Sequence, residues 1–91
     1  MMVRWSRRAL SDIAGVFAYI ATDNSQAAER VADRLYAAGE SLARFPERGR
    51  TARLTGRREL VVEQYIITYR LRRGDVFVLA VEHGAQRRES R

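Results

Sequence analysis

Apolar residues recur every three or four positions through the first half of the chain, which is the spacing of amphipathic helices. A first helix is predicted to begin after Ser6, whose hydroxyl can cap it, and a second after the polar cluster at 22–25. The apolar side of the first helix is expected to carry Leu10, Ile13, Phe17 and Ile20. That of the second is expected to carry Ala28, Val31, Leu35, Ala38, Leu42 and Phe45, before Pro46. So short a connection predicts that the two helices lie antiparallel.

The second half alternates apolar and polar residues, which is typical of strands. Strands are predicted at 60–62, 65–71 and 76–82, with a shorter one at 3–5, and the polar segment 47–58 is predicted to be a loop or an irregular strand. A three-residue turn at 72–74 would pair Tyr69 with Phe77, Ile67 with Leu79 and Tyr65 with Val81. This register places the bulky residues against the helices. It leaves an open face that carries Ile66, Thr68, Arg70, Val76, Val78, Ala80 and Glu82.

The order of elements is strand, helix, helix and then three strands. This order predicts an α+β fold in which an N-terminal strand precedes an antiparallel helical hairpin that packs on a small, mainly antiparallel sheet. A chain of 91 residues is expected to form one such domain, 1–91. The direction of the first strand in the sheet stays open.

Composition excludes several classes of protein. The chain has no cysteine, so disulfides and thiolate metal sites are excluded and a reducing cytoplasm is the expected location. A single histidine makes a metal site improbable, and no glycine-rich phosphate loop points to a nucleotide, so no cofactor is expected. The longest apolar run, 76–81, is too short to span a membrane.

The net charge is +6, and all 17 basic residues are arginine. Residues 1–45 hold six arginines and five acidic residues, whereas residues 46–91 hold eleven and six. An anionic partner is therefore expected to meet the strand-rich half. The excess fits nucleic acid, the ribosome or an acidic protein, although arginine usage alone is also what a GC-rich genome produces.

Few side chains suggest chemistry. His83, the only histidine, is either a general acid or base or a surface or packing residue. Arg70 on the open face either pairs with Glu82 or Glu59 or faces a ligand. The arginines near the C-terminus are either solvated or bind an anionic surface: Arg87, Arg88 and Arg91. A groove for an amphipathic partner segment could form from Val16, Tyr19 and Tyr36.

Several short elements occur in an order that resembles the RelE/ParE family, the toxins of bacterial type II toxin–antitoxin pairs. They include Trp5-Ser6, Tyr19-Ile20, Leu42 with Phe45-Pro46, Arg58-Glu59-Leu60-Val61, Tyr65–Arg70 and Leu79–Arg87. The resemblance spans nearly the whole chain. It implies a small antitoxin partner, typically with a ribbon-helix-helix DNA-binding N-terminus, whose C-terminal segment wraps the toxin in a hetero-oligomer. We expect the antitoxin to contact the apolar and aromatic surface of Val16, Tyr19 and Tyr36 and the basic residues Arg70 and Arg87.

The resemblance leaves two targets open. RelE-like enzymes cut mRNA on the ribosome, and on this chain such chemistry would use His83, Arg70, Arg87 and Arg58. Many of them carry an arginine where this chain has Ile66, and a late tyrosine, whereas no tyrosine follows Tyr69 here. The Arg58–Val61 and His83–Arg87 elements are more similar to ParE members, which inhibit DNA gyrase by binding it. The target contacts would then be Arg70, His83, Arg87, Arg88 and Arg91.

One departure from the ParE pattern is the absence of an aromatic residue after the last motif, where this chain has Arg88-Glu89-Ser90. This departure counts against gyrase as the target. A third alternative is a degenerate toxin that binds only its antitoxin.

Overall fold

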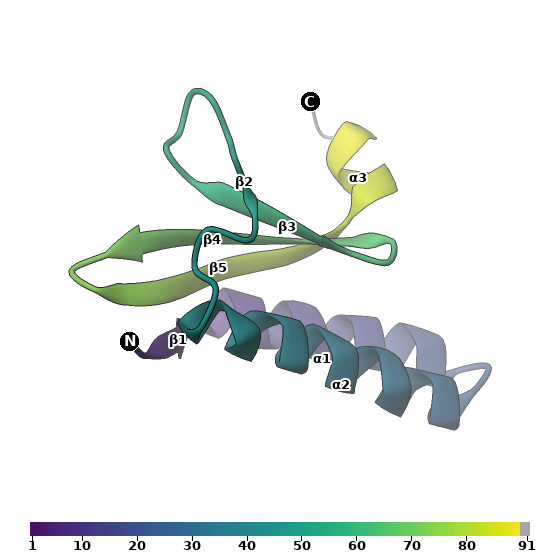
Figure 1. Ribbon diagram of the computed structural model, residues 1–91. Coiled ribbons are helices and arrows are strands. Elements are labelled where there is room, and N and C mark those ends of the chain that lie inside the picture. The colour runs from purple at the N-terminus through teal and green to yellow at the C-terminus, as the bar shows by residue number, and fades with distance from the viewer. Residues whose placement is uncertain (90–91) are drawn as a thin grey trace.

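A computed structural model describes residues 1–89 and contains a five-stranded sheet with two long helices and one short one. In chain order the elements are β1 (Val3–Trp5), α1 (Arg7–Ala21), α2 (Ser25–Glu40), the 3₁₀ helix η1 (Ser41–Ala43), β2 (Arg50–Thr51), β3 (Arg58–Val62), β4 (Tyr65–Arg72), β5 (Asp75–His83) and α3 (Gly84–Glu89). Figure 1 shows α1 and α2 below the sheet and α3 above it. No helix within the described range is long and apolar enough to cross a membrane.

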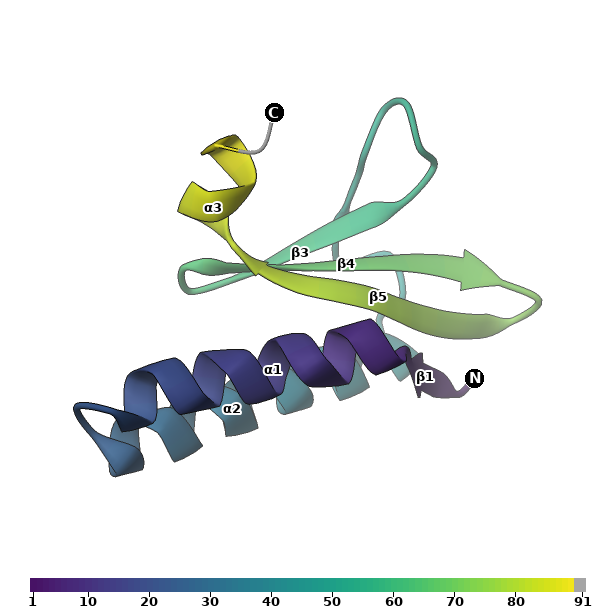
Figure 2. The same cartoon turned by 180° about the vertical axis from the view of Figure 1, so that it is seen from behind.

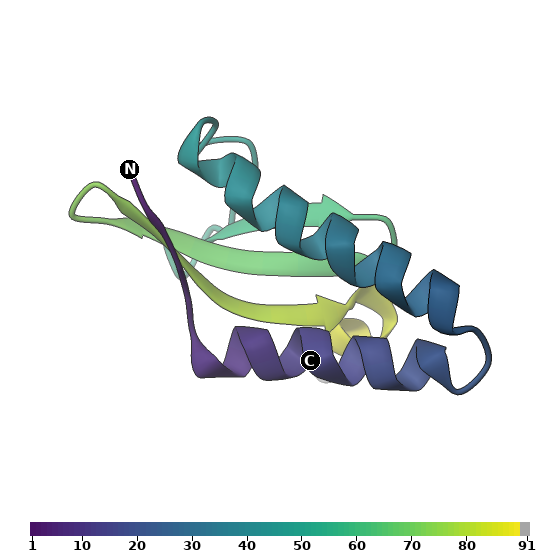
Figure 3. The same ribbon diagram turned by 90° about the horizontal axis from the view of Figure 1, so that it is seen from below.

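The sheet has the strand order β1-β5-β4-β3-β2, and every neighbouring pair is antiparallel except β1 with β5. The helical hairpin lies across one face, as the view from below shows (Figure 3). This arrangement confirms the predicted α+β fold. It also gives the direction that the sequence left open, since β1 runs parallel to β5 with Val3 beside Val76. Asp75 helps to hold β1, because its carboxylate accepts hydrogen bonds from the Met2 N–H (3.0 Å) and from Arg4 (3.2 Å). These two contacts lower the pKa of Asp75.

The first long helix begins after the predicted cap Ser6, and the second begins within the predicted polar cluster 22–25, where Asn24 is the cap. The Ser6 hydroxyl accepts a hydrogen bond from the Ala9 N–H, and the Asn24 side chain accepts one from Ala27, each at 3.0 Å. The core between helices and sheet is built around fully buried side chains: Ile13, Leu35, Leu42, Ile67, Tyr69, Val76 and Val78. The seam of α2 is confirmed through Leu42.

Three residues predicted on the apolar helix faces are exposed. Leu10 and Phe17 are 42% and 37% exposed, because the buried stripe of α1 runs through Ala9 and Ile13 and leaves them at its margin. Phe45 is 60% exposed, because the regular helix ends at Glu40 and the tighter 3₁₀ turn changes the direction of the following residues.

The predicted register of the last hairpin is wrong. The turn has two residues, Arg73 and Gly74, so Arg72 pairs with Asp75, and a β-bulge at Leu79 then adds one residue to β5. Tyr69 therefore lies opposite Val78 instead of Phe77. Val76 and Val78, which were predicted on the open face, are fully buried against the helices.

Beyond the bulge, the partners of the β4 residues lie two positions further along β5 than predicted. Ile67 lies opposite Val81 instead of Leu79, and Tyr65 lies opposite His83 instead of Val81. The residue that caps α1 holds the bulge, since the Ser6 hydroxyl donates to the Leu79 carbonyl at 3.0 Å.

The turn at Arg73-Gly74 supplies a test of this register. Both residues have positive φ, 53° and 80°, as a type I′ turn requires, and arginine is poorly suited to that conformation. Arg73→Asn is expected to raise the free energy of unfolding by about 0.5 kcal/mol, because asparagine adopts positive φ more readily. Urea denaturation measures the difference. Gly74→Ala is the opposing control and should lower stability; a destabilised Arg73→Asn variant would contradict the two-residue turn.

Candidate functional site

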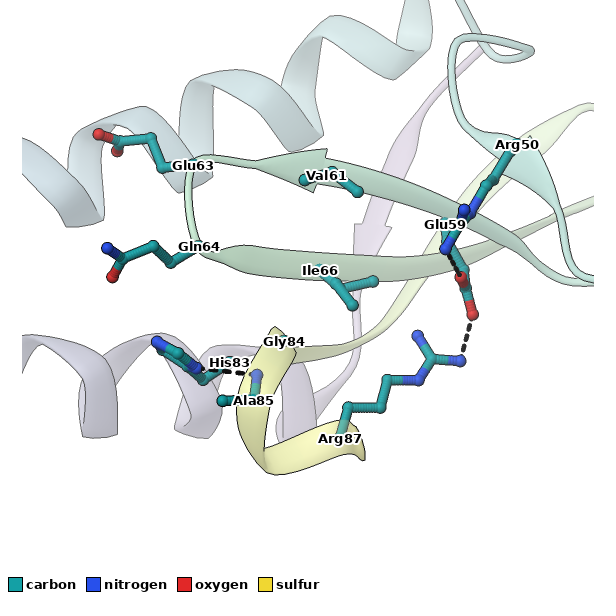
Figure 4. A pocket seen from close by; sticks show the side chains of 10 residues that line it. All are labelled: Arg50, Glu59, Val61, Glu63, Gln64, Ile66, His83, Gly84, Ala85 and Arg87. Atoms are coloured by element: carbon teal, nitrogen blue, oxygen red, sulfur yellow. Dashed lines mark hydrogen bonds and ion pairs between the residues drawn. The ribbon is translucent and has the colours of Figure 1, made fainter. Parts of the chain in front are cut away.

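The face of the sheet opposite the helical hairpin carries a buried acidic residue, Glu59 of β3, which is only 6% exposed. Two guanidinium groups meet its carboxylate, Arg50 from β2 at 3.3 Å and Arg87 from α3 (Figure 4). A buried carboxylate is costly unless it is paired and hydrogen-bonded. The three side chains therefore form one cluster, termed here the Glu59 cluster.

The segment before β2 is fixed by the core. The Tyr69 hydroxyl accepts a hydrogen bond from the Gly49 N–H and donates one to the Pro46 carbonyl, both at 2.8 Å. Arg58 donates to the Gly49 carbonyl at 2.9 Å. A Cβ on Gly49 would lie 2.7 Å from the Tyr69 hydroxyl oxygen and 2.9 Å from the Glu59 carbonyl oxygen. Only glycine permits so close an approach. The backbone at Gly49 is therefore fixed, and it positions the neighbouring residue Arg50 at the start of β2.

At the C-terminal end, the chain turns over the open face directly after β5. The Gly84 N–H donates to the Gln64 carbonyl at 2.9 Å, and the Ala85 N–H donates to Nδ1 of His83 at 3.1 Å. The short helix α3, which the sequence did not predict, then lies above the sheet on the side away from α1 and α2 (Figure 2). Arg87, one turn into α3, reaches Glu59.

A hollow of about 430 Å³ lies beside the Glu59 cluster. Its floor is apolar, since Val61 and Ile66 contribute to it and Val61 is 58% exposed. Its remaining lining residues are Arg50, Glu59, Glu63, Gln64, His83, Gly84, Ala85 and Arg87. In Figure 4 the side chains of His83 and Arg87 extend in opposite directions, Arg87 toward Glu59 and His83 away from it.

His83 lines this hollow and also contacts a second set of residues. Its ring packs edge-to-face on Tyr65, with ring centres 5.4 Å apart. Both line a second hollow of about 580 Å³, between α1 and the end of β5, together with Val16 and Tyr19. Burial raises the pKa of Tyr65, and the nearby Glu63 carboxylate and Tyr19 raise it further. Tyr19 is 79% exposed at the mouth of this hollow, which is termed here the α1 groove.

The structure separates the residues predicted to bind an antitoxin. Val16 and Tyr19 meet in the α1 groove, whereas Tyr36 packs against Trp5 with ring centres 5.2 Å apart. Neither Arg70 nor Arg87 lines the α1 groove.

Arg70 lies at the other end of β4, opposite Phe77, and is exposed. Neither acid predicted to pair with it does so. Glu59 pairs with Arg50 and Arg87, and Glu82 pairs with Arg8 at 3.3 Å. Among the side chains described for residues 1–87, no acid forms an ion pair with Arg70.

Three further predicted residues have other placements. Arg58 is bound to backbone carbonyls of the segment before β2. Arg88 lies in α3, but its side chain, like the whole of Arg91, falls outside the described residues. His83, Arg70, Arg87 and Arg58 therefore do not converge on one point. Within the described part of the chain, no group of three possible metal ligands occurs either.

Glu59 and Arg50 are the site residues that sequence reasoning missed. In the sequence, Glu59 stands out as part of the Arg58–Val61 element and as a possible partner of Arg70, but not as a site residue. The sequence did contain information about the orientation of Glu59. Neighbouring residues of a strand point to opposite faces of the sheet, and Leu60 is apolar and expected in the core, so Glu59 must point to the open face that carries arginine. Which arginine it meets depends on α3.

Comparison with known proteins gives concordant results. Residues 3–88 match the family model described as the ParE toxin of type II toxin–antitoxin systems, parDE. The chain is 42% identical over 84 residues to Toxin RelE2 of Caulobacter vibrioides, covering 92% of this chain and 96% of that protein. It is 43% identical over 86 residues to Putative toxin Y4kP of Sinorhizobium fredii, covering 92% and 88%.

A solved structure titled as the chromosomal ParDE toxin–antitoxin system from P. aeruginosa is similar in fold. The TM-score is 0.79, at 18% sequence identity, and the match covers 91% of this chain and 95% of that one. At this sequence identity, the similarity establishes the fold alone.

Proposed function

This chain belongs to the family of ParE toxins of type II toxin–antitoxin systems, and from that membership we propose that it arrests growth by binding DNA gyrase and not by cutting RNA. The observation that supports a binding mechanism is the divergence of the side chains that a nuclease would need. Arg87 is engaged by Glu59, and His83 extends away from it toward Tyr65 and the α1 groove.

Cleavage of a phosphodiester bond needs positive charge and a proton-transfer group that converge on one phosphate. On the open face the Arg87 charge is countered by a buried carboxylate, and the exposed floor beside it is the apolar Val61 with Ile66. An inhibitor that acts by contact needs no such convergence. It needs a surface, and the arginines of residues 46–91 supply one of positive charge.

The purified chain, freed of antitoxin, tests this proposal in two parallel assays. In the first, DNA gyrase supercoils relaxed plasmid in the presence of the toxin, and inhibition is expected. In the second, ribosomes programmed with mRNA are incubated with the toxin, and the mRNA is expected to stay intact. Cleavage in the ribosomal A site that disappears in His83→Ala would establish the nuclease alternative. A folded chain that binds its antitoxin and is inert in both assays would be a degenerate toxin.

The antitoxin that family membership implies is proposed to dock in the α1 groove through an amphipathic segment, with an acidic extension toward Arg70 and Arg87. Val16 and the exposed ring of Tyr19 supply apolar area there. Exposed charge pairs contribute only ~0–1 kcal/mol each, so apolar contacts should dominate the affinity.

Tyr19→Ala is therefore expected to weaken antitoxin binding about tenfold or more. Tyr36→Ala, which alters an aromatic residue outside the α1 groove, is the matched control and should weaken binding less. Titration calorimetry measures both. The affinity of the unaltered toxin for its antitoxin should fall by less than about tenfold between roughly 0.1 and 0.5 M salt. Dissociation of the complex over that range would contradict the expectation that apolar contacts contribute more than charge pairs.

A further inference from the structure

We infer that Glu59 is a positioning residue for the C-terminal segment. Its carboxylate holds Arg87, and with it α3, across the open face of the sheet. Arg87 is one of the arginines predicted to contact the target, so its position would matter for target binding. The consequence for target binding rests on the proposed function; the positioning itself does not.

The helix α3 cannot hold this position by itself. It has six residues, and isolated helices shorter than roughly a dozen residues are marginal in water. Ala85 and Gln86 are exposed, and no residue of 84–87 belongs to the buried core. With so little apolar burial, the placement of α3 depends on its polar contacts.

Those contacts fall into two groups. The hydrogen bonds of Gly84 to Gln64 and of Ala85 to His83 fix only the first residues after β5. The ion pair of Arg87 with Glu59 fixes a point one turn later. Two points define a direction, so the contact with Glu59 sets the direction in which α3 crosses the sheet (Figure 4).

The pair is unlike the other ion pairs of the described chain. The Glu59 side chain is 6% exposed and that of Arg87 is 22% exposed, whereas Arg34 and Glu63 are 55% and 44% exposed. Solvated pairs contribute little, but removal of one partner from a buried pair leaves a charge without compensation.

Few neighbouring groups could replace Arg87 as a partner of the buried Glu59 carboxylate. Thr68 lies directly opposite Glu59 on β4, and its buried hydroxyl has no hydrogen-bond partner among the described residues, so it does not satisfy the carboxylate. Arg50, the other partner, is 73% exposed at the sheet edge. Arg87 is thus the more buried of the two partners, and its loss or that of Glu59 should release the same segment.

Hydrogen–deuterium exchange on the full chain tests the positioning directly. In Glu59→Gln, the amides of 86–89 should exchange about tenfold faster or more, while those of Gly84 and Ala85, and those of β4 and β5, keep their protection. Arg87→Gln should give the same increase, and the double variant should exchange no faster than either single one, because both substitutions break one contact. Glu82→Gln is the matched control, since Glu82 pairs with Arg8 of α1, and it should leave 84–89 unchanged.

Arg87 lies on a peripheral helix, so Arg87→Gln keeps the test informative if Glu59→Gln fails to fold. Unchanged exchange at 86–89 in a folded Glu59→Gln or Arg87→Gln variant would overturn the inference, as would full additivity in the double variant.

Growth arrest after induction gives the functional readout. Glu59→Gln should lose about tenfold in potency at equal protein level, and Glu59→Asp, which keeps the charge on a shorter side chain, should recover part of it. The exchange result separates the two proposals. If 86–89 loosen in Glu59→Gln while the target proves to be the ribosome, the positioning role of Glu59 stands and the gyrase proposal falls.

Discussion

Gly49→Ala is expected to lower the free energy of unfolding by about 2–3 kcal/mol or more. The added Cβ would lie 2.7 Å from the Tyr69 hydroxyl oxygen and 2.9 Å from the Glu59 carbonyl oxygen. The carbonyl belongs to the backbone of β3, so it cannot move aside without disturbing the sheet. Displacing the Tyr69 ring instead would break its hydrogen bonds with Gly49 and Pro46 in the core.

Urea denaturation of the purified chain measures the loss. Gly15→Ala is the matched control, because Gly15 lies in α1 and a Cβ there meets nothing within 4 Å. That variant should be neutral or more stable by up to about 1 kcal/mol, since alanine favours the helix. Equal stability of the two variants would contradict a close approach of Gly49 to Tyr69.

The second large effect concerns toxicity. Joint replacement of Arg87, Arg88 and Arg91 by glutamine is expected to reduce growth arrest about tenfold or more, because a binding inhibitor depends on its charged contact surface. His83→Ala should stay within about threefold of the unaltered chain, whereas loss of a true general acid or base removes ~100- to 10,000-fold of a rate. Growth after induction, normalised to the amount of toxin, measures both.

Arg30→Gln and Arg34→Gln on the outer surface of α2 control for a general loss of positive charge. The opposite result would contradict the proposal: a His83→Ala variant that is harmless to the host and a triple arginine variant that is fully toxic.

Local patterns were sufficient to predict the main elements of the fold. The caps at Ser6 and Asn24, the seam of α2 through Leu42 and the alternation from Tyr65 each depend on residues close in sequence. The register of β4 with β5 does not. It depends on a bulge at Leu79 whose carbonyl is held by Ser6, a contact between residues 73 positions apart. No local pattern encodes such a contact.

The candidate site was predicted less well for the same reason. The arginines were evident, but their partners depend on where α3 lies. Glu59 was one of two acids considered for Arg70, and Arg87 reaches it instead because Gly84 turns the chain back over the open face. Likewise Tyr19 and Tyr36 are both exposed aromatic residues of the hairpin, yet only Tyr19 lines the α1 groove.

The parallel pairing of β1 with β5 has a consequence for how the toxin folds during synthesis. Val3 leaves the ribosome early but pairs with Val76, and the Leu79 carbonyl that accepts from Ser6 is made later still. Contacts that join distant parts of a chain form slowly, because a long loop must close before they contribute any stability. A chain that is truncated before β5 therefore has an incomplete sheet, and the toxin fold is complete only after β5 has been translated.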